Sequence, residues 1–311
     1  MVQSLDEVTA FERALVIGIG GGGDILATVP TARFLELLDL EVYLGGVAWQ
    51  PVPRDVRAGP RSIAELIEVE PIADHVAIAQ SGARTVDGVE LPEGAVASKV
   101  DQPVFVLDIC DGPSPLADSV SSVIEEHAID LVIGVDAGGD VLAEGDELGI
   151  RSPLTDAIGL TLLGALDVAT ILGVLGYGSD GELTEDELDH ATAELARKDG
   201  VLGAWGITPQ VRGELESLLE VVETEASRLP VDAAKGEFGT FSIRDGRRDA
   251  HIGPTSMITL YFDPQLVADR SAIVDLLKGL TDIEMAAAAL REAGIHTELD
   301  TEHERLERQH E

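Results

Sequence analysis

The chain has 311 residues and a formal net charge of −37, with 58 acidic residues against 21 basic ones. This charge argues against duplex nucleic acid and anionic membranes as partners, because phosphate groups are bound by basic surfaces. Only four basic residues are lysines, and 45% of the residues are hydrophobic. An acidic disordered protein is therefore excluded, and we expect a folded halophilic protein whose surface repulsion is screened by molar salt.

Apolar runs typical of buried parallel strands alternate with helical patterns along the first half of the chain. The order is a strand and loop at 15–24, a helix at 25–38, a strand at 42–49, a helix from about Ile63, strands at 75–80 and 104–109 around an excursion at 81–102, and a second strand and loop at 131–140. This order predicts an α/β fold with a mostly parallel, doubly wound (Rossmann-like) sheet.

The second half begins with a long apolar stretch, 157–178, which Asp167 interrupts. It predicts a buried helix at 153–166 and a buried strand at 169–175, and no membrane span. Helices at 184–198 and 208–229, a hairpin turn at Asp245-Gly246, a strand at 256–263 and helices at 264–277 and 283–293 follow. We expect one domain over residues 1–297, with a β-hairpin-rich excursion at about 236–263 and a charged, frayed C-terminal tail at 298–311.

Two further features bear on location. Cys110 is the only cysteine, so an internal disulfide framework and a CxxC zinc site are excluded. The first residues show no basic region followed by an apolar stretch, which a signal peptide would need. We therefore expect a cytoplasmic protein.

One segment occurs twice in the chain. Residues 15–27 read LVIGIGGGGDILA and residues 131–143 read LVIGVDAGGDVLA, with nine identical positions of thirteen. Each copy is an apolar strand followed by glycines and one aspartate. Ligands of open α/β sheets bind outside the carboxyl ends of strands, where the strand order reverses, so the two loops are expected to flank one crevice. The alternative is that both are only strand–turn–helix packing units.

The first loop contains Gly18, Gly20 and Gly23 in the GxGxxG spacing of dinucleotide sites. The acidic residue expected at the end of the second strand is missing, because that strand ends in LGGV. We predict ligand contacts from Gly20, Gly21, Gly22 and Gly23 in the first loop and from Gly138 and Gly139 in the second, whose backbone amides suit an anion.

Asp24 stands where a bare phosphate would be repelled, unless a divalent cation lies between the two groups. Asp24 and Asp140 are therefore predicted metal ligands, and Mg²⁺ is the candidate cofactor, because it prefers one or two carboxylates together with phosphate and water. Asp140 is also a candidate catalytic residue. The alternative is that each aspartate caps the helix that follows it.

Two arginine clusters stand out against the acidic background. Arg54, Arg57 and Arg61 follow the second strand and are predicted to bind an anion. The cluster at 244–248 is more readily explained by pairing with surface acids. His251 is a candidate general base, with a structural role as its alternative. Ser152 closely follows the second glycine loop and is a candidate ligand contact or helix cap.

The motifs GGGGD, LGGVAW and GVDAGGDVLAEGDELGIRSPLTDA resemble an archaeal and bacterial family, domain of unknown function 1152. The resemblance extends from about Ala14 through the C-terminal helices. It implies a stand-alone cytoplasmic protein and no particular activity.

Two functional hypotheses follow. In the first, the protein binds a small anionic metabolite, phosphorylated or nucleotide-like, with the help of Mg²⁺, and acts on it as an enzyme. In the second, it is a non-catalytic small-molecule-binding or sensor protein, and in that role a homo-oligomer is conceivable. An ordered nucleophile beside a metal would distinguish the first from the second.

Overall fold

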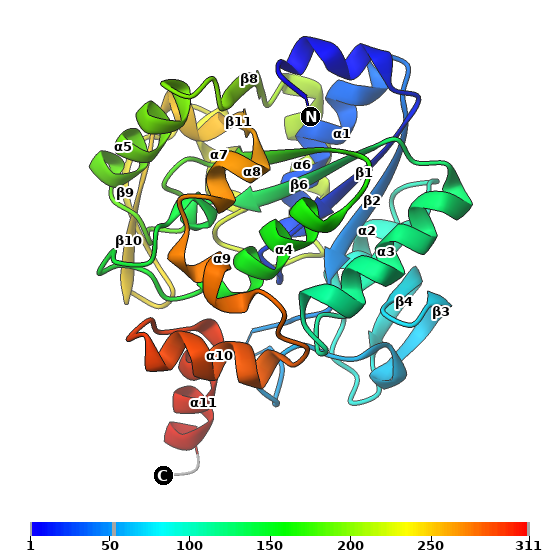
Figure 1. Cartoon of the computed structure of the whole chain (residues 1–311), viewed down its shortest axis with the longest axis vertical. Helices are drawn as coiled ribbons and strands as arrows, with labels where there is room; N and C mark the ends of the chain where they lie inside the picture. The colour runs from blue at the N-terminus through cyan, green and yellow to red at the C-terminus, as the bar shows by residue number, and fades with distance from the viewer. Residues whose placement is uncertain (1, 52–53, 310–311) are drawn as a thin grey trace.

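A nine-stranded sheet forms the centre of the computed structural model, which describes residues 2–51 and 54–309 (Figure 1). The strand order is β3-β4-β5-β2-β1-β6-β7-β11-β8. The strands are β1 (Arg13–Gly18), β2 (Glu41–Val47), β3 (Leu66–Ala73), β4 (Val76–Thr85), β5 (Val104–Leu107), β6 (Leu131–Ala137), β7 (Ala169–Leu175), β8 (Val201–Gly206) and β11 (Ile258–Phe262). This arrangement confirms the predicted α/β class.

The five central strands, β5, β2, β1, β6 and β7, are mutually parallel. Strands β3, β4 and β11 run antiparallel to their neighbours and extend the sheet at both sides. The chain places β2 on one side of β1 and later returns to place β6 on the other side. The strand order thus reverses between β1 and β6, where open α/β sheets bind ligands.

Helices cover both faces of the sheet, and each face has its own hydrophobic core. In Figure 1, α3, α4 and α9 lie in front of the sheet, and α1 and α6 lie behind it. The helices are α1 (Thr28–Glu36), α2 (Pro92–Ala97), α3 (Pro113–His127), α4 (Pro153–Ala165), α5 (Glu185–Ala196), α6 (Pro209–Leu219), α7 (Arg228–Ala234), α8 (Pro264–Ala268), α9 (Ala272–Leu277), α10 (Ile283–Glu292) and α11 (Glu298–Gln309).

A separate hairpin of β9 (Gly239–Ile243) and β10 (Arg248–Ile252) forms around Asp245-Gly246, as the sequence predicts. Its apolar residues Ile243, Ala250 and Ile252 pack with Leu229 and Ala233 of α7 in a small third core. Arg244 and Asp245 both adopt left-handed backbone angles, with φ of 54° and 58°. This tight turn points its arginines toward the cavity described below.

Four expected elements differ from the structure. One is the helix expected at 264–277, which is divided into α8 and α9. The helix expected from Ile63 is a single turn followed by β3, because β-branched Ile67 and Val69 favour a strand that pairs with β4. The helix expected at 208–229 is divided into α6 and α7. The residues between them pack on the first glycine loop, where the Ser227 hydroxyl donates to the Gly23 carbonyl oxygen at 3.1 Å.

The last difference concerns the end of the chain. The segment expected to be a frayed tail forms α11, which lies beside α10 in Figure 1. Thr297, fully buried, stabilises its start through reciprocal hydrogen bonds with Asp300. Leu299 is buried in the main core. No helix in the described part of the chain has the length and apolar character to cross a bilayer.

Candidate functional site

A cavity of about 510 Å³ lies where β1 and β6 end. Its walls come from segments that are far apart in the sequence: the first glycine loop, the loop after β2, the end of β6, the start of α4, the loop after β7, the connection between α6 and α7, the hairpin turn and α11. The sheet positions this cavity, because parallel neighbours β1 and β6 end at the same edge.

Asp24 connects the two glycine loops. Its Oδ2 accepts hydrogen bonds from the amides of Gly20, at 3.2 Å, and of Ala137, at 3.3 Å. It is the first residue of the 3-10 helix Asp24–Ala27 and makes no side-chain cap to that helix. A Cβ on Gly20 would overlap Asp24 Oδ2, so only glycine leaves room for this carboxylate.

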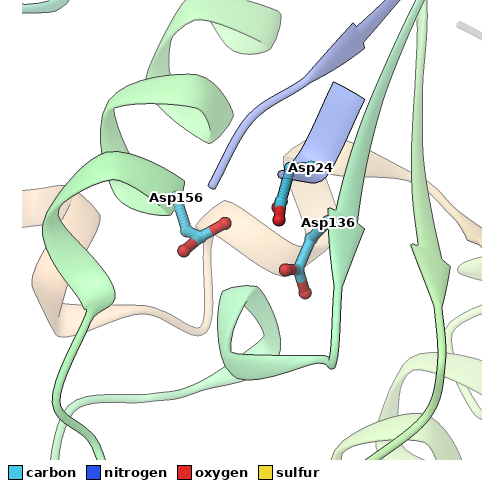
Figure 2. A group of neighbouring side chains, drawn as sticks. All are labelled: Asp24, Asp136 and Asp156. Atoms are coloured by element: carbon cyan, nitrogen blue, oxygen red, sulfur yellow. The ribbon is translucent and has the colours of Figure 1, made fainter. Parts of the chain in front are cut away.

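Asp24, Asp136 and Asp156 form a compact group, which we call the acid triad. One carboxylate oxygen from each lies within 4.8 Å of the others, and Figure 2 shows the three side chains pointing toward one another. All three are buried. Asp136 Oδ2 accepts from the Gly139 amide at 2.8 Å, whereas Oδ1 of Asp156 has no hydrogen-bond partner among the described residues.

A second carboxylate group, Asp140, Asp180 and Glu182, lines or borders the same cavity. Asp140 Oδ2 accepts from the Ser152 hydroxyl at 3.3 Å, and that hydroxyl also donates to Glu182. Asp180 accepts from the Asp140 amide at 3.2 Å. Arg248 pairs with Glu182 at 2.6 Å, so this group is partly neutralised by the protein itself.

Burial and mutual repulsion raise the pKa of these aspartates. Burial raises the pKa of Asp24 to about 7 and that of Asp180 to about 6. The pKa values of Asp136, Asp140 and Asp156 are raised further, first by burial and then by the neighbouring carboxylates. Such a group is stabilised either by protons or by a cation.

Arginines gather at the same cavity. Seven line it among the described residues: Arg54, Arg151, Arg244, Arg247, Arg248, Arg305 and Arg308. The pKa of Arg305 is lowered, first by burial and then by the charges of Arg247 and Arg244. These three guanidinium groups are therefore close enough to repel one another, an arrangement that an anion would relieve.

Helix α11 closes one side of the cavity with two glutamates. The carboxylate of Glu298 accepts hydrogen bonds from the amides of Leu154 and Thr155 at the start of α4. Glu302, which is 3% exposed, accepts from the indole Nε1 of Trp49 at 3.0 Å and from the Gly59 amide at 2.8 Å.

Comparison with known proteins gives a family and no activity. The family model described as "Protein of unknown function (DUF1152)" matches residues 15–306. The chain belongs to the DUF1152 family. The matched range contains every residue that lines the cavity except Arg308. No curated protein and no solved structure matches this DUF1152 chain.

Most of the predicted site residues of this DUF1152 protein meet in the cavity. It is lined by Gly20, Gly21, Gly22, Gly23, Asp24, Arg54, Asp140 and Ser152. Gly138 and Gly139 were also predicted, but they are not among the residues that line the cavity. A Cβ on Gly138 would overlap the Asp180 carboxylate, and Gly139 donates its amide to Asp136. The predicted metal ligand Asp140 is not part of the acid triad, which contains Asp24 with Asp136 and Asp156.

Three predicted residues lie elsewhere. Arg61 is 1% exposed and is held by a hydrogen bond from its Nε to Asp55, at 2.7 Å. Arg57 pairs with Glu65, and neither arginine lines the cavity. His251 is on the outer hairpin, with its ring 3.7 Å from Glu185, and it does not line the cavity either.

Three residues of the site, Asp136, Asp156 and Glu298, were not predicted from the sequence. Asp136 could have been found from the repeat. It stands in the second copy where the first copy has Gly20, and it is the only difference between the copies that introduces an acidic residue. Asp156 is the last residue of the motif SPLTD, which also occurs as SPLAD at 114–118. For Glu298 we find no local signal, since α11 reaches the cavity only through the tertiary fold.

Proposed function

We propose that this DUF1152 protein binds a small phosphate-bearing metabolite together with a divalent cation, for which Mg²⁺ is the expected ion. One observation carries the proposal: an acid triad with an unpartnered buried oxygen lies in the same cavity as a group of mutually repelling arginines. Carboxylates bind the hard cation, arginines bind the anion, and a metal-bound phosphate needs both.

The triad suits a small, hard cation. Mg²⁺ binds oxygens at about 2.1 Å, which places two of its ligands roughly 3–4.2 Å apart. The triad oxygens lie within 4.8 Å of one another, so small side-chain adjustments would bring them to this spacing. Asp24, Asp136 and Asp156 would hold the cation, and Asp156 Oδ1 would gain the partner that it lacks among the described residues.

The arginines suit the anion. Arg244 lines the cavity, and its side chain makes no ion pair or hydrogen bond with the described residues. Its charge lowers the pKa of Asp24, so the guanidinium acts on the triad through space. A phosphate between Arg244 and a triad-bound cation would neutralise both, and a cavity of about 510 Å³ is large enough for a small metabolite.

Catalysis on the ligand is the finer part of the proposal. A bound divalent cation would polarise a phosphate oxygen. Among the predicted catalytic residues, Asp140 is the candidate base, because it lines the cavity and is 6% exposed. A sensor would show the same binding without turnover, so assay of phosphate release from the bound compound distinguishes the two.

The test is calorimetry at 2 M KCl with inorganic pyrophosphate and ADP, first with Mg²⁺ and then with EDTA. We expect binding only with Mg²⁺, and an affinity at least about 100-fold lower in Asp156→Asn. Asp118→Asn is the matched control, because Asp118 occupies the same position of an SPLxD motif but is exposed on α3. Equal affinity with Mg²⁺ and with EDTA would refute the metal role.

A further inference from the structure

The start of α4 is bound by a carboxylate from the other end of the chain. Glu298 Oε1 accepts from the Thr155 amide at 2.7 Å and from the Thr155 hydroxyl at 2.5 Å, while Oε2 accepts from the Leu154 amide at 3.1 Å. Three donors thus converge on one oxyanion. A helix start with its free amides and positive dipole end binds phosphate as readily as a carboxylate.

A second observation links this helix start to the ligand cavity. Asp156 belongs to the same first turn of α4, is 3% exposed and carries the unpartnered Oδ1 in the acid triad. A group bound to the Leu154 and Thr155 amides is therefore next to the cation that the triad would hold. Glu298 is close enough that its charge contributes to the raised pKa of Asp156.

Glu298 itself is replaceable there without unfolding α11. It is the first residue of that helix, and its side chain is half-buried. Glu302, one turn later, keeps α11 attached through Trp49 and Gly59, and Leu299 stays in the core. A rotation of the Glu298 side chain alone would free all three donors.

We propose that the start of α4 is a phosphate subsite of the ligand cavity, and that Glu298 occupies it as an internal competitor. This inference rests on the proposed function and specifies its ligand. One phosphate binds Leu154, Thr155 and the triad-bound cation, and a second binds Arg244, Arg247 and Arg305 across the cavity. The ligand class is a compound with at least two phosphate groups.

The test measures Mg²⁺-dependent binding of inorganic pyrophosphate, and of orthophosphate, by calorimetry at 2 M KCl. Glu298→Ala removes the competitor, so its affinity for pyrophosphate should rise by about 5–10-fold over the natural chain. Glu298→Gln, which keeps a hydrogen-bond acceptor but no charge, should give a smaller rise. Orthophosphate should bind more weakly than pyrophosphate in every variant.

Two controls make the result specific. Glu307→Ala removes the same charge from an exposed position of α11 and should leave the affinity unchanged. Thr155→Val in the Glu298→Ala background should reverse most of the gain, because it removes a subsite donor. Circular dichroism melts confirm that each variant is folded.

The outcomes separate the two proposals. Magnesium-dependent binding that Asp156→Asn abolishes, with an unchanged or lower affinity in folded Glu298→Ala and Glu298→Gln, would overturn the subsite and leave Glu298 as a structural cap of α4. Failure of pyrophosphate to bind the natural chain and every Glu298 variant would overturn the proposed function and the subsite together.

Discussion

In the first copy of the repeated segment, residues 15–27, Asp24 turns toward the second copy and accepts the amide of Ala137. In the second copy, residues 131–143, Asp140 turns away from the first and accepts the hydroxyl of Ser152. Both aspartates begin a short 3-10 helix after a glycine turn, so the backbone is alike while the side-chain surroundings differ.

The difference originates at one position of the repeat. The first copy has Gly20, and the second has Asp136 in its place. Gly20 leaves space for the Asp24 carboxylate. A Cβ added to Gly20 would lie 3.1 Å from Asp156 Oδ1. Asp136 fills the equivalent position with a third carboxylate. The two copies therefore contribute complementary parts of one acid triad, and equivalent residues do not have equivalent roles.

The largest expected effect comes from exchanging one aspartate at a time. Asp24→Asn should lower the affinity for Mg²⁺ by about 100-fold or more, because it removes a triad ligand. Asp140→Asn should change this affinity much less, since Asp140 contributes no oxygen to the triad. Calorimetric titration with Mg²⁺ measures both. Similar losses in the two variants would show that the repeat is symmetric in function.

Substitution of two glycines should distinguish the need for space beside the Asp24 carboxylate from the need for a positive backbone φ. Gly20→Ala places a methyl group on the Asp24 carboxylate, and we expect a loss of Mg²⁺ affinity of about 10-fold or more. In Gly22→Ala the added Cβ meets only Pro51 Cδ, at an ordinary contact distance of 3.7 Å, but the backbone φ is 58°. This variant should therefore have a lower melting temperature and a nearly unchanged Mg²⁺ affinity. An equal loss of Mg²⁺ affinity in Gly22→Ala and Gly20→Ala would contradict this distinction.

The exposed acidic residues should make the melting temperature depend on salt, whereas the buried triad should bind Mg²⁺. With a net charge of −37, the melting temperature should rise by about 5 °C or more between 0.1 M and 2 M KCl, as surface repulsion is screened. Asp156→Asn should show the same rise in melting temperature, because Asp156 is buried and its substitution does not change the charged surface. A melting temperature that stays constant or falls in 2 M KCl would contradict the halophilic interpretation.

A buried acid outside the triad should respond to pH. Burial raises the pKa of Glu93 from 4.5 to about 8, and its Oε2 has no hydrogen-bond partner among the described residues. The protonated form favours folding, so its stabilisation is present below pH 4.5 and is lost as pH rises through 8. Glu93→Gln should reduce the fall in unfolding free energy between pH 5 and 8 by on the order of 2–3 kcal/mol.

The same measurement in the presence of Mg²⁺ separates Glu93 from the triad. Mg²⁺ should reduce the dependence of the unfolding free energy on pH that arises from the triad. It should leave unchanged the dependence that arises from Glu93. Urea unfolding at several pH values, with and without Mg²⁺, measures both parts. A Glu93→Gln variant with the same pH dependence as the natural chain would mean that Glu93 is ionised in the folded protein.

Local patterns in the sequence predicted some of the elements around the cavity. The apolar run interrupted by Asp167 is α4 and β7, and the Asp245-Gly246 hairpin forms as expected. Both are determined by short-range signals, namely apolar periodicity and turn chemistry. The repeat and the reversal rule for open sheets predicted that the two glycine loops flank one crevice, and the parallel pairing of β1 with β6 places them there.

Contacts made only in the tertiary fold could not be predicted. The two SPLxD motifs look alike, yet α3 leaves Asp118 exposed while the start of α4 faces the cavity and buries Asp156. Charge composition was equally uninformative about α11, whose acidic residues are typical of a solvated tail although Glu302 is buried against Trp49. Arg61, predicted to bind a ligand, is instead held by Asp55 six residues earlier.

The hydrogen bond from the Ala137 amide to the Asp24 carboxylate bears on when the cavity forms during folding. It joins residues 113 positions apart, across the boundary between β1 and β6. Loops of this length close late, because their entropy must be lost before the contact forms. The first half of the chain, while emerging from a ribosome, therefore carries Asp24 without the second loop. The contact between the two loops forms only after β6 has been synthesised and has paired with β1, and α11 adds the last wall of the cavity.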